Sequence, residues 1–214
     1  GVTISSDIPT TRTMGPSLWI REGGGEARRI VRFDGGSGRL PVWSPDGRRL
    51  MLSRGTTDEV TKKPVFETVM INADGSGKET LKIPREDAVL DWSSDGSLIL
   101  TASFRNAKSG YQIYVMGLDG SNPKQITAGG NPCHARFSPD GRRILYTDYT
   151  DASKDYPLGI RAVDVDGSNR RRVFDEDGSA CWAPDGKRIA VAIRGRKPEE
   201  KALLEVADLE TGSH

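Results

Sequence analysis

Short apolar runs broken by Asp-Gly pairs recur along the chain, and one such pattern is written four times. The copies are PVWSPDGRRLML from Pro41, LDWSSDGSLILT from Leu90, ARFSPDGRRILY from Ala135 and ACWAPDGKRIAV from Ala180. A second motif alternates with the first and reads NADGSGKETL, GLDGSNPKQI and DVDGSNRRRV, with a degenerate copy, REGGGEARRI, from Arg21. The Asp residues of the first motif are 49, 45 and 45 positions apart, a period typical of repeat architectures.

Both motifs predict β-hairpins, because two apolar runs flank a Gly that can adopt the positive φ of a tight turn. The predicted turn residues of the first motif are Asp46 and Gly47, Asp95 and Gly96, Asp140 and Gly141, and Asp185 and Gly186. Two hairpins in each unit of about 45 residues make four strands, the composition of a propeller blade. The sequence therefore predicts an all-β protein, a β-propeller of four-stranded antiparallel blades.

The WSPDG and DGSN motifs resemble the repeats of the TolB-like β-propeller family, whose repeats are WD-repeat-like. The resemblance covers residues 17 to 210 and implies blades that pack face to face. It implies that the aromatic residue three positions before each Asp fills the core between blades: Trp43, Trp92, Phe137 and Trp182. It also favours a bacterial, periplasmic or secreted protein.

The repeats give the predicted organisation of the chain. Residues 1–16 form an N-terminal extension without the apolar core of a signal peptide, residues 17–210 hold the repeats, and residues 211–214 are a tail or the remnant of a tag. The segments SLWIR and RRIVRF read as the third and fourth strands of a blade. We expect about four to five blades here, whereas the family usually has six.

Such a chain would be an incomplete or divergent propeller. The alternatives are a compact ring of four blades and a ring completed by another chain. Open blade edges would promote self-association.

The charge balance argues against two classes of partner. The 214 residues include 31 basic and 30 acidic side chains, a net charge of +1, so we expect no binding to nucleic acid. No stretch of about 18 apolar residues occurs, so we expect no insertion into a membrane.

Insertions between the second and third predicted strands account for the variable repeat length. They are RGTTDEVTKKP, SFRNAKSGY, TDYTDASKDYPLG and RGRKPEEK. In a propeller these loops share one face, and variable loops on a rigid scaffold are where binding is most often found. The candidate binding residues are Tyr111, Tyr149 and Tyr156 as aromatic anchors, with Arg105, Asp151 and His134. The alternative reading is that the loop charges are simply solvated.

The two cysteines, Cys133 and Cys181, occupy different positions relative to the Asp-Gly pairs. With His134 they are the only hint of a metal or redox site, and we expect buried free thiols, no metal and no cofactor. Asp91 and Arg136 fall on successive inner strands and are expected to pair across blades.

No nucleophile elbow, phosphate loop or zinc-protease motif occurs, so the chain is expected not to be an enzyme. The predicted function is a non-catalytic scaffold that binds a protein or peptide through its variable loop face. Two alternatives rest on fold analogy: the substrate-gating propeller of a larger prolyl-oligopeptidase-like serine hydrolase, and the sensor domain of a regulatory protein.

Overall fold

A computed structural model describes residues 2–3, 17–21, 23–105, 110–149, 159–175, 178–193 and 203–209. All regular structure in these residues is β-strand, as predicted. The chain divides into two compact units, residues 1–89 with 118–120, and residues 90–117 with 121–214.

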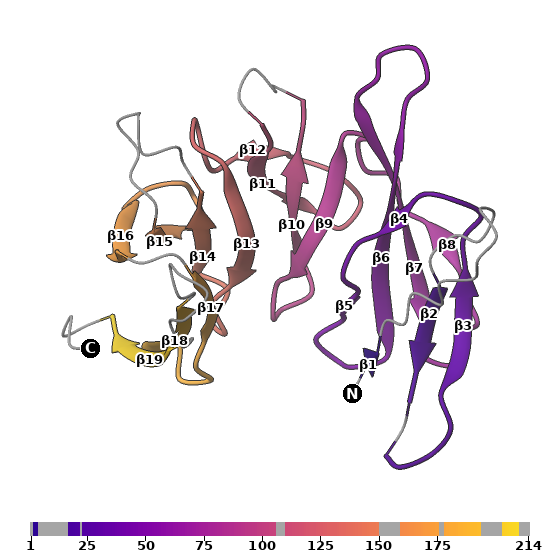
Figure 1. Ribbon diagram of the computed structural model, residues 1–214, viewed down its shortest axis with the longest axis horizontal. Coiled ribbons are helices and arrows are strands. Elements are labelled where there is room, and N and C mark those ends of the chain that lie inside the picture. Colours follow the sequence, from indigo (N-terminus) through magenta and orange to yellow (C-terminus); the bar gives the residue numbers. More distant parts are fainter. Residues whose placement is uncertain are drawn as a thin grey trace. The chain divides into compact units, whose positions relative to one another are not determined.

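The first unit holds two antiparallel sheets (Figure 1). The strands of the first sheet, in the order β1-β2-β3, are β1 (Val2–Thr3), β2 (Ser17–Ile20) and β3 (Arg28–Arg32). The second sheet, in the order β4-β6-β7-β8 with β5 also paired to β6, comprises β4 (Ser37–Gly38), β5 (Val42–Trp43), β6 (Arg49–Thr57), β7 (Pro64–Asn72) and β8 (Glu79–Thr80).

Two details of the first unit differ from the sequence prediction. β1 lies within the predicted N-terminal extension and pairs with β2, as Val2 opposite Ile20. The first strand of the second sheet is split into β4 and β5, with Pro41 between them. Proline has no N–H to donate to the ladder, which accounts for the interruption.

The second unit holds three sheets that follow one another along the chain. β9 (Asp87–Trp92), which begins in the last residues of the first unit, pairs in the order β12-β11-β10-β9 with β10 (Leu98–Ser103), β11 (Gln112–Gly117) and β12 (Lys124–Gln125). Next come β13 (Pro132–Phe137), β14 (Arg143–Asp148), β15 (Gly159–Asp164) and β16 (Arg171–Phe174), in sequence order. The last sheet is β17 (Gly178–Trp182), β18 (Arg188–Ile193) and β19 (Leu203–Asp208). The predicted four-stranded blade is therefore confirmed.

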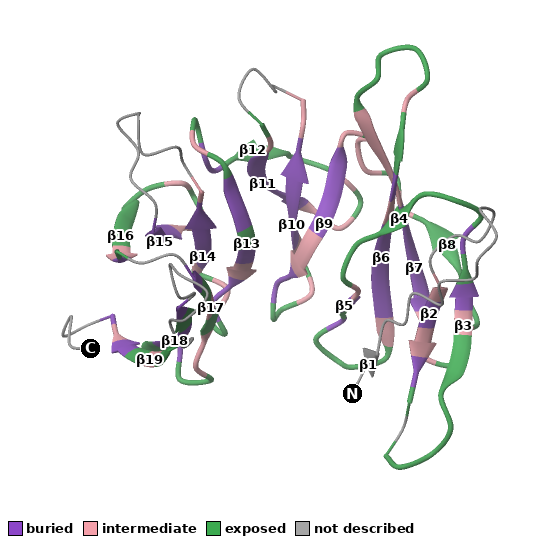
Figure 2. Ribbon diagram, viewed as in Figure 1, coloured by how far each residue is buried: buried purple, intermediate pink, exposed green. Residues whose placement is uncertain are grey.

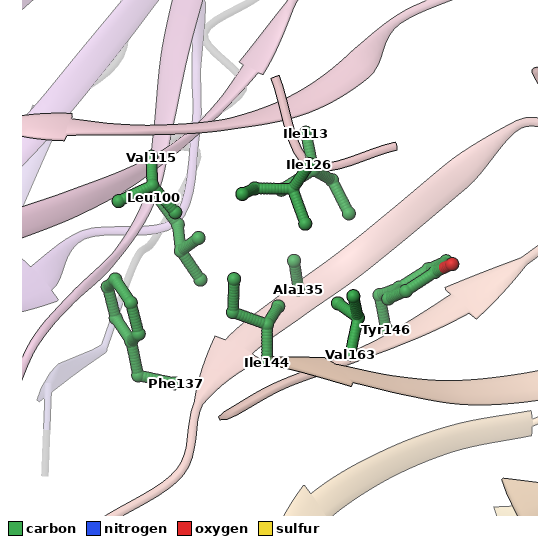
Figure 3. Packing of buried hydrophobic residues seen from close by; sticks show 9 residues of the cluster. All are labelled: Leu100, Ile113, Val115, Ile126, Ala135, Phe137, Ile144, Tyr146 and Val163. Atoms are coloured by element: carbon green, nitrogen blue, oxygen red, sulfur yellow. The ribbon is translucent and has the colours of Figure 1, made fainter. Parts of the chain in front are cut away.

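Neighbouring sheets within a unit pack their apolar faces together. In the second unit, Leu100, Ile113 and Val115 of one sheet face Phe137 and Ile144 of the next (Figure 3). In the first unit, side chains of β2 and β3 pack in the same way against those of β6 and β7. Figure 2 shows that the central strands are the buried ones and that the turns are exposed. Burial of these faces is the main stabilising term.

The repeated aromatic position is not equivalent in all four repeats. Trp92 and Phe137 are buried, with 6% and 7% of their surface exposed, and Trp182 is partly buried against the last apolar cluster. Trp43 is 38% exposed, so its assignment to the core was wrong. The Trp182 indole lies on the inner strand of the preceding sheet, where its Nε1–H donates to Arg136 O at 3.4 Å. In the sheet preceding Trp43, the described strands β1–β3 include no inner strand to cover the ring.

Three of the four Asp-Gly turns of the first motif contain the same set of hydrogen bonds. In the first copy Gly47 has φ 68° and its N–H donates to Ser44 O at 2.9 Å. The Ser44 Oγ–H donates to Asp46 Oδ1 at 2.6 Å, and Arg48 N–H donates to the same oxygen at 3.0 Å. The second and third copies repeat these contacts through Ser93 and Ser138.

The fourth copy has Ala183 in place of the serine, and there the Arg188 Nε–H donates to Asp185 Oδ2 at 2.9 Å. These donors stabilise the charged carboxylates. They lower the pKa of all four Asp residues, that of Asp95 to about 2, chiefly through the hydroxyl of Ser93.

Candidate functional site

Each sheet has two chemically different ends. The Asp-Gly turns lie at one end, which we call the turn end. Because the strands are antiparallel, the second strand of a sheet is joined to the third at the opposite end. The connections from one sheet to the next also lie there, and we call this end the loop end. Of the predicted variable segments, the described residues 54–64, 103–105, 110–111, 147–149 and 159 lie at the loop ends.

In the first unit the predicted loop over residues 54–64 is partly strand. β6 and β7 pair from Arg49 opposite Asn72 to Thr57 opposite Pro64, so only residues 58–63 form the turn. Asp58 Oδ1 accepts hydrogen bonds from Thr61 N–H at 2.8 Å and Thr61 Oγ1–H at 2.9 Å. The other carboxylate oxygen accepts a bond from Arg85 Nη2 at 2.7 Å. The hairpin tip is therefore an ordered element.

A cavity of about 460 Å³ opens beside this hairpin at the loop end. Its lining includes Gly55, where a Cβ atom would lie 2.9 Å from the Phe66 ring. The Arg39 guanidinium, which also lines the cavity, lies over that ring, 5.4 Å from its centroid.

In the second unit, the connection between β10 and β11 carries two of the predicted binding residues. The Tyr111 ring is half-buried and meets the Phe104 ring edge-on, with 5.2 Å between their centroids. The Arg105 guanidinium lies 4.4 Å from the centroid of the Tyr114 ring, and its Nε–H donates to Ser103 Oγ at 3.1 Å. Both predicted side chains are thus held against the sheet.

The structure brings His134 and Tyr149 together at the loop end of the next sheet. Their rings meet edge-on at 6.2 Å between centroids. His134 is exposed, and its φ of 54° lies in the left-handed region that a side chain other than glycine rarely adopts. It sits in a β-bulge where the register between β13 and β14 shifts. Such strain concentrates at functional positions.

Asn131 lies close to Gly110 of the neighbouring sheet. A Cβ atom at Gly110, beside Tyr111, would lie 3.3 Å from Asn131 Oδ1. Asn131 O accepts a bond from Tyr149 N–H at 3.1 Å, and Asn131 N–H donates to Asp148 Oδ1 at 2.9 Å. Asp148 also forms a buried ion pair with Arg161, 3.3 Å from Oδ2 to Nε. We call Tyr111, Asn131, His134 and Tyr149 the loop-end surface, and within it Asn131 is bonded to an aspartate that is itself paired with an arginine.

Tyr156 and Asp151, the other two predicted binding residues, lie outside the described residues. Sequence reasoning missed Phe66, which reads as an ordinary strand residue, and Arg39, which precedes the repeat motif. It also missed Phe104, although that ring stands in a predicted loop and could have been singled out with the tyrosines.

The cysteines are both free thiols. Cys133 is buried with its Sγ 3.4 Å from Nδ1 of His134, whereas Cys181 is exposed, so the predicted burial of that thiol was wrong. Within the described part of the chain, no group of three or more His, Cys, Asp or Glu side chains could hold a metal ion. The same residues include no helix long and apolar enough to cross a membrane.

Several solved structures resemble this chain, including the following three. TolB from Acinetobacter baumannii matches with a TM-score of 0.74 and 18% identity, over 99% of this chain and 49% of that chain. An oligogalacturonate lyase in complex with manganese matches with a TM-score of 0.64 and 15% identity, over 92% and 60%. The β-propeller domain of the Trilobed protease from Pyrococcus furiosus, described as having an open velcro topology, matches with a TM-score of 0.58 and 15% identity, over 79% and 52%. This chain spans about half the length of the A. baumannii TolB chain.

The sequence profile of one family covers most of the chain. The profile described as the TolB beta propeller domain matches residues 11–206. The match agrees with the repeated four-stranded sheets and with their face-to-face packing. The chain therefore belongs to the TolB beta propeller domain family.

Proposed function

We propose that this chain is a non-catalytic module that binds an extended segment of a protein or peptide partner at the loop-end surface of its second unit. The observation that carries the proposal is the exposed His134, held in a left-handed backbone conformation against Tyr149. Histidine and tyrosine combine an aromatic body with a polar tip, and aromatic residues with hydrogen-bonding tips are enriched among the side chains that dominate interface energies.

Preorganisation supports this assignment. The Tyr149 backbone is bonded to Asn131, and the adjacent Asp148 is bonded to Asn131 and paired with Arg161. A partner would not have to order these groups on binding, which lowers the entropic cost of association. Tyr111, next to Gly110, adds a third aromatic ring to the same surface.

A displayed library of random linear peptides, selected against the purified chain, tests the proposal without knowledge of the partner. We expect the enriched peptides to bind Tyr149→Ala and His134→Ala at least about ten-fold more weakly. Arg142→Ala is the matched control, because Arg142 is exposed at the turn end, and its affinity should stay within about two-fold. Equal binding to the wild type and to both loop-end variants would contradict the proposal.

A second candidate is the substrate-gating propeller of a larger serine hydrolase. The likeness to the propeller domain of the Trilobed protease supports it. The test is to treat the full-length native protein with an alkyl fluorophosphonate. Covalent labelling of a serine would support the hydrolase, and an unlabelled protein would contradict it.

A further inference from the structure

A second cavity opens at the turn end of sheet β13–β16, away from the loop-end surface. Its volume is about 460 Å³, within the range of small-molecule sites. Its lining includes three arginines and two buried apolar residues, with one acid: Arg143, Arg170, Arg171, Ala162, Val163 and Asp164.

Each arginine is anchored by one hydrogen bond to a backbone carbonyl. Arg143 Nη2 donates to Gly186 O, and its guanidinium lies 5.0 Å from the centroid of the Trp182 ring. Arg170 Nη2 donates to Ile126 O at 2.7 Å, and Arg171 Nη2 donates to Leu209 O at 3.0 Å. A guanidinium has five N–H donors, so each anchored group keeps further donors for a ligand.

The one acid in the lining is already engaged. Asp164 Oδ2 accepts bonds from Asn169 Nδ2 at 2.6 Å and from Ser168 Oγ at 3.5 Å. Among the described residues, no ion pair joins Arg143, Arg170 or Arg171 to a carboxylate. Arg143 and Arg171 reach towards the following sheet, whereas Arg170 reaches towards the preceding one, so two of the three guanidinium groups share one side of the sheet.

Comparison with the other repeats shows that the fold does not require these arginines. The corresponding positions in the repeat of β4–β8 are Arg49, Lys78 and Glu79, and in the repeat of β9–β12 they are Leu98, Pro123 and Lys124. All of these residues occupy the same turns and strand starts. The arginine set is therefore a feature of one repeat, as expected of a site rather than of a structural requirement.

We propose that this cavity binds a small phosphate ester, with the phosphate held by Arg143 and Arg171. A phosphate monoester carries a charge of about −2 near neutral pH and several strong acceptor oxygens, which suit the two fork-shaped guanidinium groups that share one side of the sheet. The cavity has room for more than the phosphate, and Ala162, which lies opposite Arg171 in the strand pairing, lines it. This site lies at the opposite end of the sheet from the proposed peptide surface.

Isothermal titration calorimetry of the whole chain with glycerol 3-phosphate, inorganic phosphate and glycerol tests the proposal. We expect saturable binding of glycerol 3-phosphate, weaker binding of inorganic phosphate and no binding of glycerol. Arg171→Gln should lower the affinity for glycerol 3-phosphate at least about ten-fold. Arg171→Lys keeps the charge but not the fork-shaped pair of donors, and its affinity should lie between those of the wild type and Arg171→Gln. The exposed Arg142→Gln is the control and should stay within about two-fold.

Two results would overturn the proposal. If wild type and Arg171→Gln bound glycerol 3-phosphate with the same affinity, the phosphate would not bind in this cavity. If inorganic phosphate bound more tightly than glycerol 3-phosphate, the ligand would not be an ester. Circular dichroism of each variant verifies the fold, which matters most for Arg143→Gln because that side chain also packs on Trp182. Binding should strengthen between pH 5 and pH 7.5, as the second phosphate proton with a pKa of about 6 is lost.

Discussion

The carboxylate of Asp91 accepts a hydrogen bond of 2.7 Å from the backbone N–H of Phe137, 46 residues along the chain. Arg136 completes the link in the other direction, donating from Nη1 to Leu90 O at 2.8 Å. The two side chains were expected to pair with each other, and each instead bonds to the backbone of the other's strand. The inner strands β9 and β13 are tied together in this way.

Asp91→Ala should lower the free energy of unfolding by about 1–3 kcal/mol, because it leaves a buried N–H without its acceptor. Asp91→Asn keeps an acceptor of the same shape and should stay within about 1 kcal/mol of wild type at pH 7. Urea denaturation of both variants measures the difference. If Asp91→Ala were as stable as Asp91→Asn, the hydrogen bond would not hold the two strands.

The same residue gives a pH dependence of defined sign. Burial raises the pKa of Asp91 above its usual value of 3.8, and the bond from Phe137 and the charge of Arg136 only partly oppose this. Its contribution to stability is therefore fully present below pH 3.8 and is lost as pH rises through the raised pKa. Asp91→Asn should remove that part of the pH profile.

The two tryptophans at the same repeat position should differ in their effect on stability. Trp92→Ala should cost about 3–5 kcal/mol, because the ring is buried and would leave a cavity. Trp43→Ala should cost less than half as much, since that ring keeps 38% of its surface in water. Chemical denaturation followed by circular dichroism compares them, and equal losses would place both rings in equivalent surroundings.

The turn carboxylates should titrate well below their usual range. The pKa of Asp95 is about 2, so its contribution to stability is present above pH 3.8 and is lost as pH falls from 3.8 to 2. Ser93→Ala removes the largest cause of the shift and should raise this pKa towards 3.8. Carbon-13 NMR titration of the carboxyl groups measures it.

The fourth turn provides the matched test in the opposite direction. Ala183→Ser supplies the hydroxyl that the other three turns possess, and it should lower the pKa of Asp185 further. If the pKa of Asp185 were unchanged in that variant, or if Asp95 titrated near 3.8 in the wild type, the serine hydroxyl would not stabilise these carboxylates.

The candidate site residues that the sequence predicts are those that can be recognised from their neighbours along the chain. Tyr111, Tyr149, Arg105 and His134 could be named because they stand in or beside irregular segments of an otherwise regular repeat. The edge-on contact of His134 with Tyr149 could not, because it depends on a bulge in β13 and on a left-handed backbone at a histidine. The arginine cavity also went unrecognised, since Arg143 and Arg171 are 28 positions apart and meet only across paired strands.

The amino-acid sequence alone predicts the class of fold, the strand order in the three sheets of the second unit and the position of every Asp-Gly turn of the repeated motif. These features are local, since a hairpin needs only two apolar runs and a residue that tolerates positive φ between them. Tertiary structure decided which of the repeated aromatic rings are covered and which polar side chains converge. Identical local motifs acquire different surroundings because the neighbouring sheet differs from one repeat to the next, as Trp43 and Trp92 show.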